Sequence, residues 1–145
     1  MTKYTYNKSV RLTKRRKALL KAMPFFAKLL KIHDYDVTIS LSFKHGFTEL
    51  FQAYAQVYHV STHRINIEID ASLHDNIALR ILAHEMVHVK QYVKGELSSD
   101  KNDLQLWKGK HVSDKLKYTS EPWEVEAMKK ETLMMYKYIE FRDTI

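Results

Sequence analysis

The pattern of apolar and polar positions predicts that the N-terminal part of the chain is helical. Thr13 is placed to cap a helix over residues 14–23, and Pro24 suits the first turn of a second helical segment over 25–31. Apolar side chains recur in these segments at the spacing of one helix face. They are Leu19, Leu20, Met23, Phe26, Ala27 and Leu30. We therefore expect this face to pack against a core built by the rest of the chain.

The next part of the chain has strand character in three stretches, residues 35–42, 51–60 and 63–70. The last stretch alternates strictly between apolar and polar side chains. The apolar ones are Ile65, Ile67 and Ile69, and the polar ones are Arg64, Asn66 and Glu68. Since successive side chains of a strand point to opposite faces of a sheet, this alternation predicts a strand with one buried face.

The longest apolar pattern predicts a helix that is capped by Ser72 or Asp75 and runs to about Lys94. Gly95 suits the left-handed conformation that often ends a helix. The apolar arc of this helix comprises Ala78, Leu79, Leu82, Met86, Val89 and Val93. This helix is therefore expected to lie at the centre of the protein.

The remaining chain is a polar, irregular stretch over residues 96–119, with short elements expected around 107–112, and a last helix from Pro122 to about residue 141. The order helix, three strands, helix, loop, helix predicts an α+β fold with a small sheet of three or slightly more strands. With 3 Gly and 2 Pro, the chain offers few linker candidates, so residues 1–145 are expected to form a single domain.

The composition excludes several classes of protein. The 145 residues include 24 Lys+Arg, 17 Asp+Glu and no cysteine, which gives a formal net charge of +7. Without cysteine there is no disulfide scaffold, thiolate-ligated metal site or cysteine nucleophile. No run approaches the roughly 18 apolar residues of a membrane span, and the first residues lack the apolar core of a secretory signal. We therefore expect a soluble, cytoplasmic protein without a membrane partner.

The positive charge is concentrated in an N-terminal helical segment, residues 1 to about 33, which contains ten Lys or Arg residues and no acidic residue. Six of these side chains cluster on and just before the first predicted helix. They are Arg11, Lys14, Arg15, Arg16, Lys17 and Lys21. Such a cluster can neutralise the phosphates of a nucleic acid, and a solvated helix face is the alternative interpretation.

The middle of the long apolar helix carries the pattern H-E-x-x-H, as His84-Glu85-Met86-Val87-His88. Residues four apart face the same way on a helix, so the two imidazoles can converge on one ion, and Glu85 can reach a water on that ion. The pattern therefore predicts a Zn²⁺ site with Glu85 as the catalytic base. The alternative is a histidine pair on a partly exposed helix flank, with Glu85 in a surface ion pair.

A third protein ligand is needed, because catalytic zinc normally takes three. The candidates downstream of the motif are His111, Glu121, Glu124 and Glu126. Helical phase places Glu124 on the apolar face of the last helix and Glu126 on the face that carries Lys130 and Lys137. We therefore expect Glu124 to face inward as the third ligand and Glu126 to face outward. The alternatives are His111 as the third ligand, and a Glu124 that caps the last helix.

These residues also carry a family resemblance. The segment His84-Glu85-x-x-His88, followed at a distance by Glu124-x-x-Ala127, resembles the arrangement in gluzincin metallopeptidases, in particular small intracellular minimal gluzincins and SprT-like domains. The resemblance implies that the two histidines and Glu124 hold Zn²⁺ while Glu85 activates a water. It further implies a protein or peptide substrate.

The resemblance extends to the surroundings of the motif. The strand over residues 63–69 resembles the edge strand that pairs with an extended substrate in such enzymes. Tyr118 and His111 are the candidates to donate a hydrogen bond to the oxyanion, and a packed tyrosine and a surface histidine are the alternative interpretations. Glu131 is expected to orient a metal ligand or to form a salt bridge at the core edge, and Trp107 and Trp123 to anchor the core. The rival function is a nucleic-acid-binding module whose zinc site is structural or silent.

Overall fold

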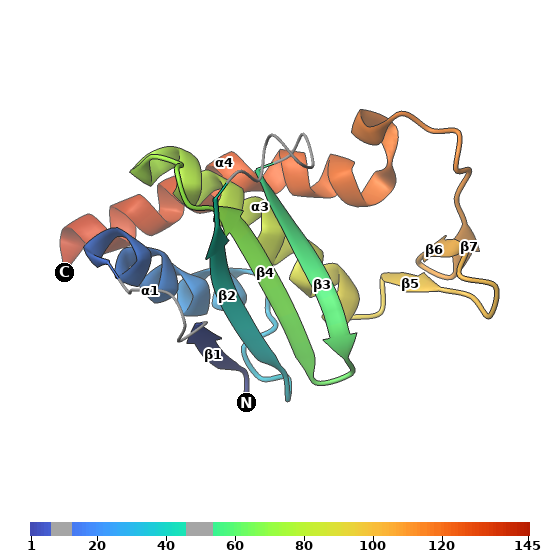
Figure 1. The fold of residues 1–145 in the computed structure, drawn as a ribbon, viewed down its shortest axis with the longest axis horizontal. Coiled ribbons are helices and arrows are strands. Elements are labelled where there is room, and N and C mark those ends of the chain that lie inside the picture. The colour runs from blue at the N-terminus through green and yellow to red at the C-terminus, as the bar shows by residue number, and fades with distance from the viewer. Residues whose placement is uncertain (7–12, 46–53) are drawn as a thin grey trace.

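The computed structural model describes residues 1–6, 13–45 and 54–145, and these residues form an α+β fold (Figure 1). The larger sheet contains β1 (Lys3–Tyr6), β2 (Thr38–Lys44), β3 (Ala55–Ser61) and β4 (Arg64–Asp70). The smaller sheet contains β5 (Leu97–Ser99), β6 (Gln105–Trp107) and β7 (Lys110–His111). The helices are α1 (Lys14–Leu29), α3 (Asp75–Val93), the short 3-10 helix η1 (Tyr118–Ser120) and α4 (Pro122–Thr144). The predicted α+β class is confirmed.

The larger sheet has the strand order β1-β2-β4-β3, in which β1, β2 and β4 run parallel and β3 runs antiparallel to β4. Its buried face carries Ile39, Leu41, Ile65, Ile67 and Ile69, each at most 1 % exposed. The predicted alternation is confirmed by this burial. The N-terminal strand β1 was not predicted, because its sequence Lys-Tyr-Thr-Tyr has too few apolar positions to show a pattern.

Strand β4 is not an edge strand, so the expectation that residues 63–69 lie at the edge is wrong. A two-residue turn joins β3 to β4 as an antiparallel hairpin, and β4 also pairs with β2. This hairpin leaves β3 as the edge strand of the described sheet. The predicted stretch 51–60 is therefore observed as Ala55–Ser61, and residues 51–53 lie outside the described residues.

Helix α1 is continuous through Pro24, although the sequence predicted two segments. Proline removes one backbone donor, yet its fixed φ is helical. The buried face on both sides of Pro24, which includes Met23 and Phe26, holds the helix together against the core. The predicted cap is confirmed, because the Thr13 hydroxyl accepts a hydrogen bond of 3.2 Å from the backbone N–H of Arg16.

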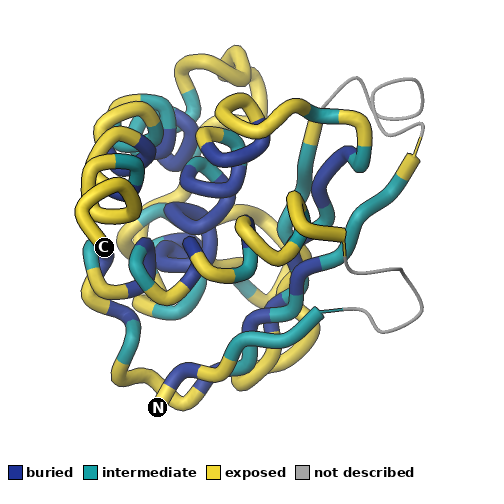
Figure 2. The backbone as a smooth tube through the Cα atoms, turned by 90° about the vertical axis from the view of Figure 1, so that its left-hand side faces the viewer, coloured by how far each residue is buried: buried dark blue, intermediate teal, exposed yellow. Residues whose placement is uncertain are grey.

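Helix α3 lies at the centre of the core, as predicted. The helices cover one face of the larger sheet, and the smaller sheet stands apart at one end of the molecule (Figure 1). Figure 2 shows that buried positions gather where the helices meet one another and the sheet. On α3 these positions include Leu82, Met86 and Val89, none of them exposed. None of the described helices is long and apolar enough to cross a membrane.

The N-terminal end of α3 differs from the prediction, whereas its C-terminal end agrees with it. The N-cap residue is His74, which makes no side-chain cap bond within the described structure, rather than Ser72 or Asp75. Ser72 is instead held by Asp70, whose Oδ1 accepts from the backbone N–H and the hydroxyl of Ser72 at 2.8 and 2.6 Å. Gly95 follows the helix with φ 71°, which confirms the predicted left-handed terminator.

The predicted irregular stretch after α3 contains the smaller antiparallel sheet, whose strands pair in the order β5-β6-β7. Its strands are two or three residues long, which is too short for a periodic pattern in the sequence. The tight turn after β5 is organised by Asp100, whose Oδ1 accepts from the backbone N–H groups of Asn102 and Leu104.

Candidate metal centre

The structure brings His84 and His88 of α3 together with Glu124 of α4. The Nε2 atoms of the two imidazoles lie 2.9 and 3.2 Å from Oε1 of Glu124, and the ring centroids are 4.9 Å apart. One ligand atom from each of the three residues lies within 4.8 Å of the others. The inward orientation of Glu124, which was predicted from helical phase, is confirmed.

The three residues fit a zinc ion. Two imidazole nitrogens and one carboxylate oxygen form the donor set of many catalytic zinc sites. The side chains of His84, His88 and Glu124 are 12 %, 10 % and 8 % exposed, so they are largely withdrawn from water. The Nε2 atoms of both imidazoles face the same carboxylate oxygen of Glu124, so the three donor groups converge.

The charges of these side chains balance one another. Burial lowers the pKa of His88, but a hydrogen bond with Glu124 and the charges of Glu85 and Glu124 outweigh it and raise that pKa to about 9. Burial raises the pKa of Glu124, but hydrogen bonds with His84, His88 and Tyr118 outweigh it and lower that pKa to about 2. Without a metal, an imidazolium of His88 therefore pairs with the carboxylate of Glu124 at neutral pH. A cation that binds here would take the place of the proton on Nε2 of His88.

Glu85 lies beside the two histidines in a hollow of about 230 Å³. The hollow is lined by the edge strand β3, at Ala55, Gln56 and Val57, and by residues of α3, the smaller sheet and the start of α4. Burial raises the pKa of Glu85, while the nearby His88 and His84 oppose that rise. The arrangement places a buried carboxylate next to a candidate metal position and an open sheet edge.

Tyr118 of η1 lines the same hollow and hydrogen-bonds to Glu124. Burial and the negative charge of Glu124 raise the pKa of Tyr118, so its phenol stays protonated and can donate a hydrogen bond. His111, the other predicted donor and alternative third ligand, lies on β7, where its Nε2 is 2.7 Å from Oδ2 of Asp100. It does not belong to the His84, His88 and Glu124 group, the one candidate metal cluster among the described residues.

Glu126 does not face outward, so this prediction is wrong. Its carboxylate accepts hydrogen bonds from Lys90 at 2.6 Å, Gln91 at 3.0 Å and Lys130 at 2.9 Å. Burial raises the pKa of Glu126, but these bonds outweigh it and lower that pKa to about 2. Helical phase within α4 alone could not place Glu126, because the buried Lys90 of α3 requires a carboxylate partner at the interface of the two helices.

Two further acidic residues lie near the centre. Glu131 approaches it from α4, with its Oε2 3.7 Å from Nδ1 of His84, which is an ion-pair distance and too long for a hydrogen bond. Glu121 is the N-cap residue of α4, and burial together with the charge of Glu124 raises its pKa. Glu121 lies outside the cluster that the described residues form.

Gln91 lies on the polar stripe of α3 that also carries His84 and His88, but the sequence analysis assigned it no role in this centre. Its Oε1 lies 2.8 Å from Nδ1 of His88, and its Nε2 lies 2.9 Å from the backbone oxygen of Trp123. The available signal was its position three residues after His88, which places it on the same helix face. Trp123 is buried, as predicted, while Trp107 is only partly buried, with its ring centroid 6.4 Å from that of Trp123.

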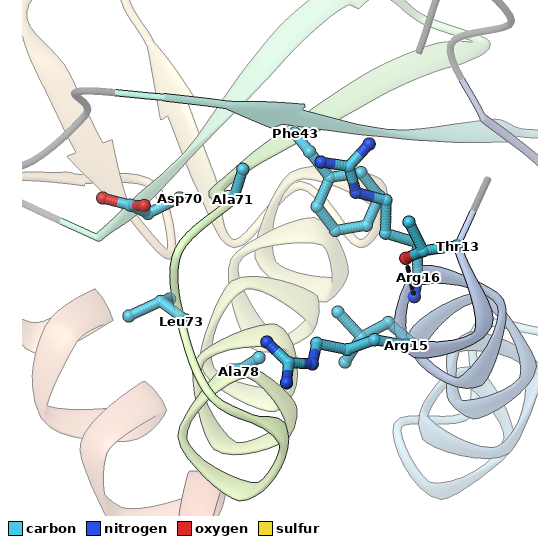
Figure 3. A pocket seen from close by; sticks show the side chains of 9 residues that line it. Thr13, Arg15, Arg16, Phe43, Asp70, Ala71, Leu73 and Ala78 are labelled. Atoms are coloured by element: carbon cyan, nitrogen blue, oxygen red, sulfur yellow. Dashed lines mark hydrogen bonds between the residues drawn. The ribbon is translucent and has the colours of Figure 1, made fainter. Parts of the chain in front are cut away.

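The basic residues near the N-terminus do not form one free surface. Arg15 pairs with Asp75 at 2.7 Å, and the guanidinium of Arg16 lies 4.8 Å above the centre of the Phe43 ring. Both arginines line a hollow of about 250 Å³ between α1 and the sheet (Figure 3). The exposed lysines of this cluster are Lys14, Lys17 and Lys21, and Arg11 lies outside the described residues.

Comparisons with models of protein families, with curated proteins and with solved structures found no match to this chain. The functional interpretation of the centre therefore rests on the geometry of its own residues.

Proposed function

We propose that the protein is a zinc-dependent peptidase of gluzincin type. The observation that carries this proposal is the convergence of His84, His88 and Glu124 beside the buried Glu85. Glu85, His88 and Glu124 line a hollow that the edge strand β3 borders. A structural zinc site would need neither the adjacent carboxylate nor the open hollow.

The chemistry that a Zn²⁺ ion held by these residues would supply is polarisation of a substrate carbonyl and activation of water near neutral pH. Glu85 takes a proton from the attacking water as its oxygen bonds to the carbonyl carbon. It then passes that proton to the amide nitrogen as the C–N bond breaks. Tyr118 donates a hydrogen bond from its phenol to the carbonyl oxygen, where negative charge develops, and keeps its proton.

The substrate class follows from the sheet edge. Among the described strands, β3 pairs only with β4, and its residues Ala55, Gln56 and Val57 line the hollow. An edge strand offers unpaired backbone donors and acceptors, which an extended peptide can pair with. We therefore propose unfolded or extended protein segments as substrates.

The test is the variant Glu85→Gln, assayed on a dye-labelled unfolded protein. The amide keeps the shape of the side chain but cannot take a proton, so we expect kcat/KM to fall by about 10² to 10⁴ while the zinc content stays at one ion per chain. Asp70→Asn is the matched control, because Asp70 is equally buried but lies outside this hollow. Full activity of Glu85→Gln, or no cleavage by the zinc-loaded wild type, would refute the proposal.

A second candidate function is binding of a nucleic-acid backbone, and the distribution of exposed lysines favours it. Lys14, Lys17, Lys21 and Lys28 share one exposed face of α1 and extend over about 21 Å at 1.5 Å per residue. Past the end of α1, a hollow of about 330 Å³ is lined by further lysines of α3, of α4 and of the residues that follow α1 and α3. They are Lys31, Lys94, Lys129 and Lys137, together with Lys90 and Lys130, which pair with Glu126. No acidic residue of the described chain lines this hollow.

The test of this surface is the salt dependence of binding to a short DNA duplex. Changing Lys14, Lys17 and Lys21 to Glu should reduce the slope of log K against log salt by about three, since each phosphate contact contributes about one. The control changes three exposed lysines elsewhere, Lys101, Lys115 and Lys117, to Glu. Equal slopes for the two triple variants, or no binding by the wild type, would refute a DNA-binding role for α1.

A further inference from the structure

The side chain of Gln91 is completely buried between the two helices that carry the candidate ligands. Its amide group makes three hydrogen bonds: Oε1 with Nδ1 of His88, and Nε2 with the backbone oxygen of Trp123 and with Oε1 of Glu126. A buried amide is tolerated only when it is paired in this way. Gln91 therefore links α3 to α4 at the level of the metal centre.

The partners of Gln91 fix the orientation of its amide. The backbone oxygen of Trp123 and the carboxylate of Glu126 can only accept hydrogen bonds, so Nε2 must face them and Oε1 must face His88. Nδ1 of His88 is consequently the donor in their 2.8 Å hydrogen bond. This leaves Nε2 of His88, the atom that faces Glu124, as the ligating nitrogen.

The same amide also places the third ligand. Trp123 directly precedes Glu124. The hydrogen bond from Gln91 to the backbone oxygen of Trp123 therefore holds the first turn of α4 against α3. Glu126, the other acceptor, is itself fixed by Lys90 at 2.6 Å and Lys130 at 2.9 Å. The position of Gln91 is thus determined from both helices.

We propose that Gln91 is a positioning residue that sets the ligands His88 and Glu124 of a zinc site at the same time. This inference rests on the zinc site of the proposed function. It predicts that loss of the amide weakens zinc binding and changes the coordination geometry, and does not merely destabilise the fold.

The first test compares Gln91→Met, which keeps the volume without hydrogen bonds, with Thr2→Val. Thr2 is a buried residue whose hydroxyl bonds to the backbone oxygens of Ile32 and Tyr35, away from the centre. In chelator competition, we expect the zinc dissociation constant of Gln91→Met to rise about 10- to 100-fold. The visible absorption of the Co²⁺-loaded variant should also change, whereas Thr2→Val should leave both quantities unchanged.

A second pair of variants decides the matter if Gln91→Met does not fold. Glu126→Ala and Glu96→Ala each remove one carboxylate partner of Lys90, but only Glu126 contacts Gln91. Zinc affinity should fall in Glu126→Ala and stay unchanged in Glu96→Ala. Unchanged affinity and an unchanged Co²⁺ spectrum in the folded Gln91 variant, or equal affinities in the Glu pair, would overturn the inference. A wild type that binds no zinc would instead overturn the proposed function.

Discussion

Glu124→Gln tests the third ligand through the thermal stability of the protein. A ligand that binds only the folded state stabilises it by about 2.7 kcal/mol at a concentration 100 times its dissociation constant. For a domain of this size each kcal/mol shifts the melting temperature by about 2–4 °C, so zinc should raise it by about 5–11 °C in the wild type. Glu124 supplies the carboxylate that both imidazoles face, so the variant should lose most of this shift.

The assay is calorimetry or dye-based melting of wild type, Glu124→Gln and His111→Gln, each with excess chelator and with zinc. His111→Gln is the control, because His111 is exposed and bonds to Asp100 rather than to the centre. The reasoning fails if Glu124→Gln keeps the full zinc shift while His111→Gln loses it. A helix cap at Glu124 predicts a third pattern, in which Glu124→Ala loses about 0.5–2 kcal/mol of stability but keeps the zinc shift.

Three further predictions concern the fold. Phe26→Ala should lower the free energy of unfolding by about 3–5 kcal/mol in urea titrations, because Phe26 is fully buried and packs on Tyr138. A loss below about 1 kcal/mol would contradict this packing. Pro24→Ala should raise the same free energy by about 1–3 kcal/mol, since alanine restores a helical N–H, and a lower stability would show that proline is needed there. The pKa of Asp100 is lowered by a hydrogen bond with His111 and by backbone N–H groups. The ionised carboxylate therefore stabilises the folded state above the ordinary carboxyl range, and this stabilisation is lost as pH falls through the lowered pKa. The fluorescence of Trp107 should therefore change on acidification in the wild type, and Asp100→Asn should show the acid spectrum already at neutral pH.

The sequence predicted the parts of the centre that depend on local geometry. His84, Glu85 and His88 lie within five residues, so helical spacing alone determines how they face one another. Glu124 was found from the phase of its own helix, because its apolar neighbours mark the buried side. The prediction of these residues did not depend on how α3 and α4 pack.

The sequence could not predict features that arise from packing between elements. Glu126 turns inward because Lys90 and Gln91 of another helix face it, and no pattern within α4 records that contact. Strand β4 carries the clearest alternation and was expected at the edge, but the hairpin to β3 places it inside the sheet. Alternation reports which face of a strand is buried, and it does not report the order of the strands.

The division of the centre between two helices has a consequence for biosynthesis. His84 and Glu124 are 40 residues apart in the sequence. The hydrogen bonds of the Gln91 amide are complete only when the backbone oxygen of Trp123 is in place. Synthesis proceeds from the N-terminus at about 5–20 residues per second, so the sheet and α3 are synthesised before α4 is complete. A nascent chain therefore carries both histidines without the carboxylate that unites them. If the centre is hydrolytic, a nascent copy is inactive toward its neighbours until its own α4 has docked.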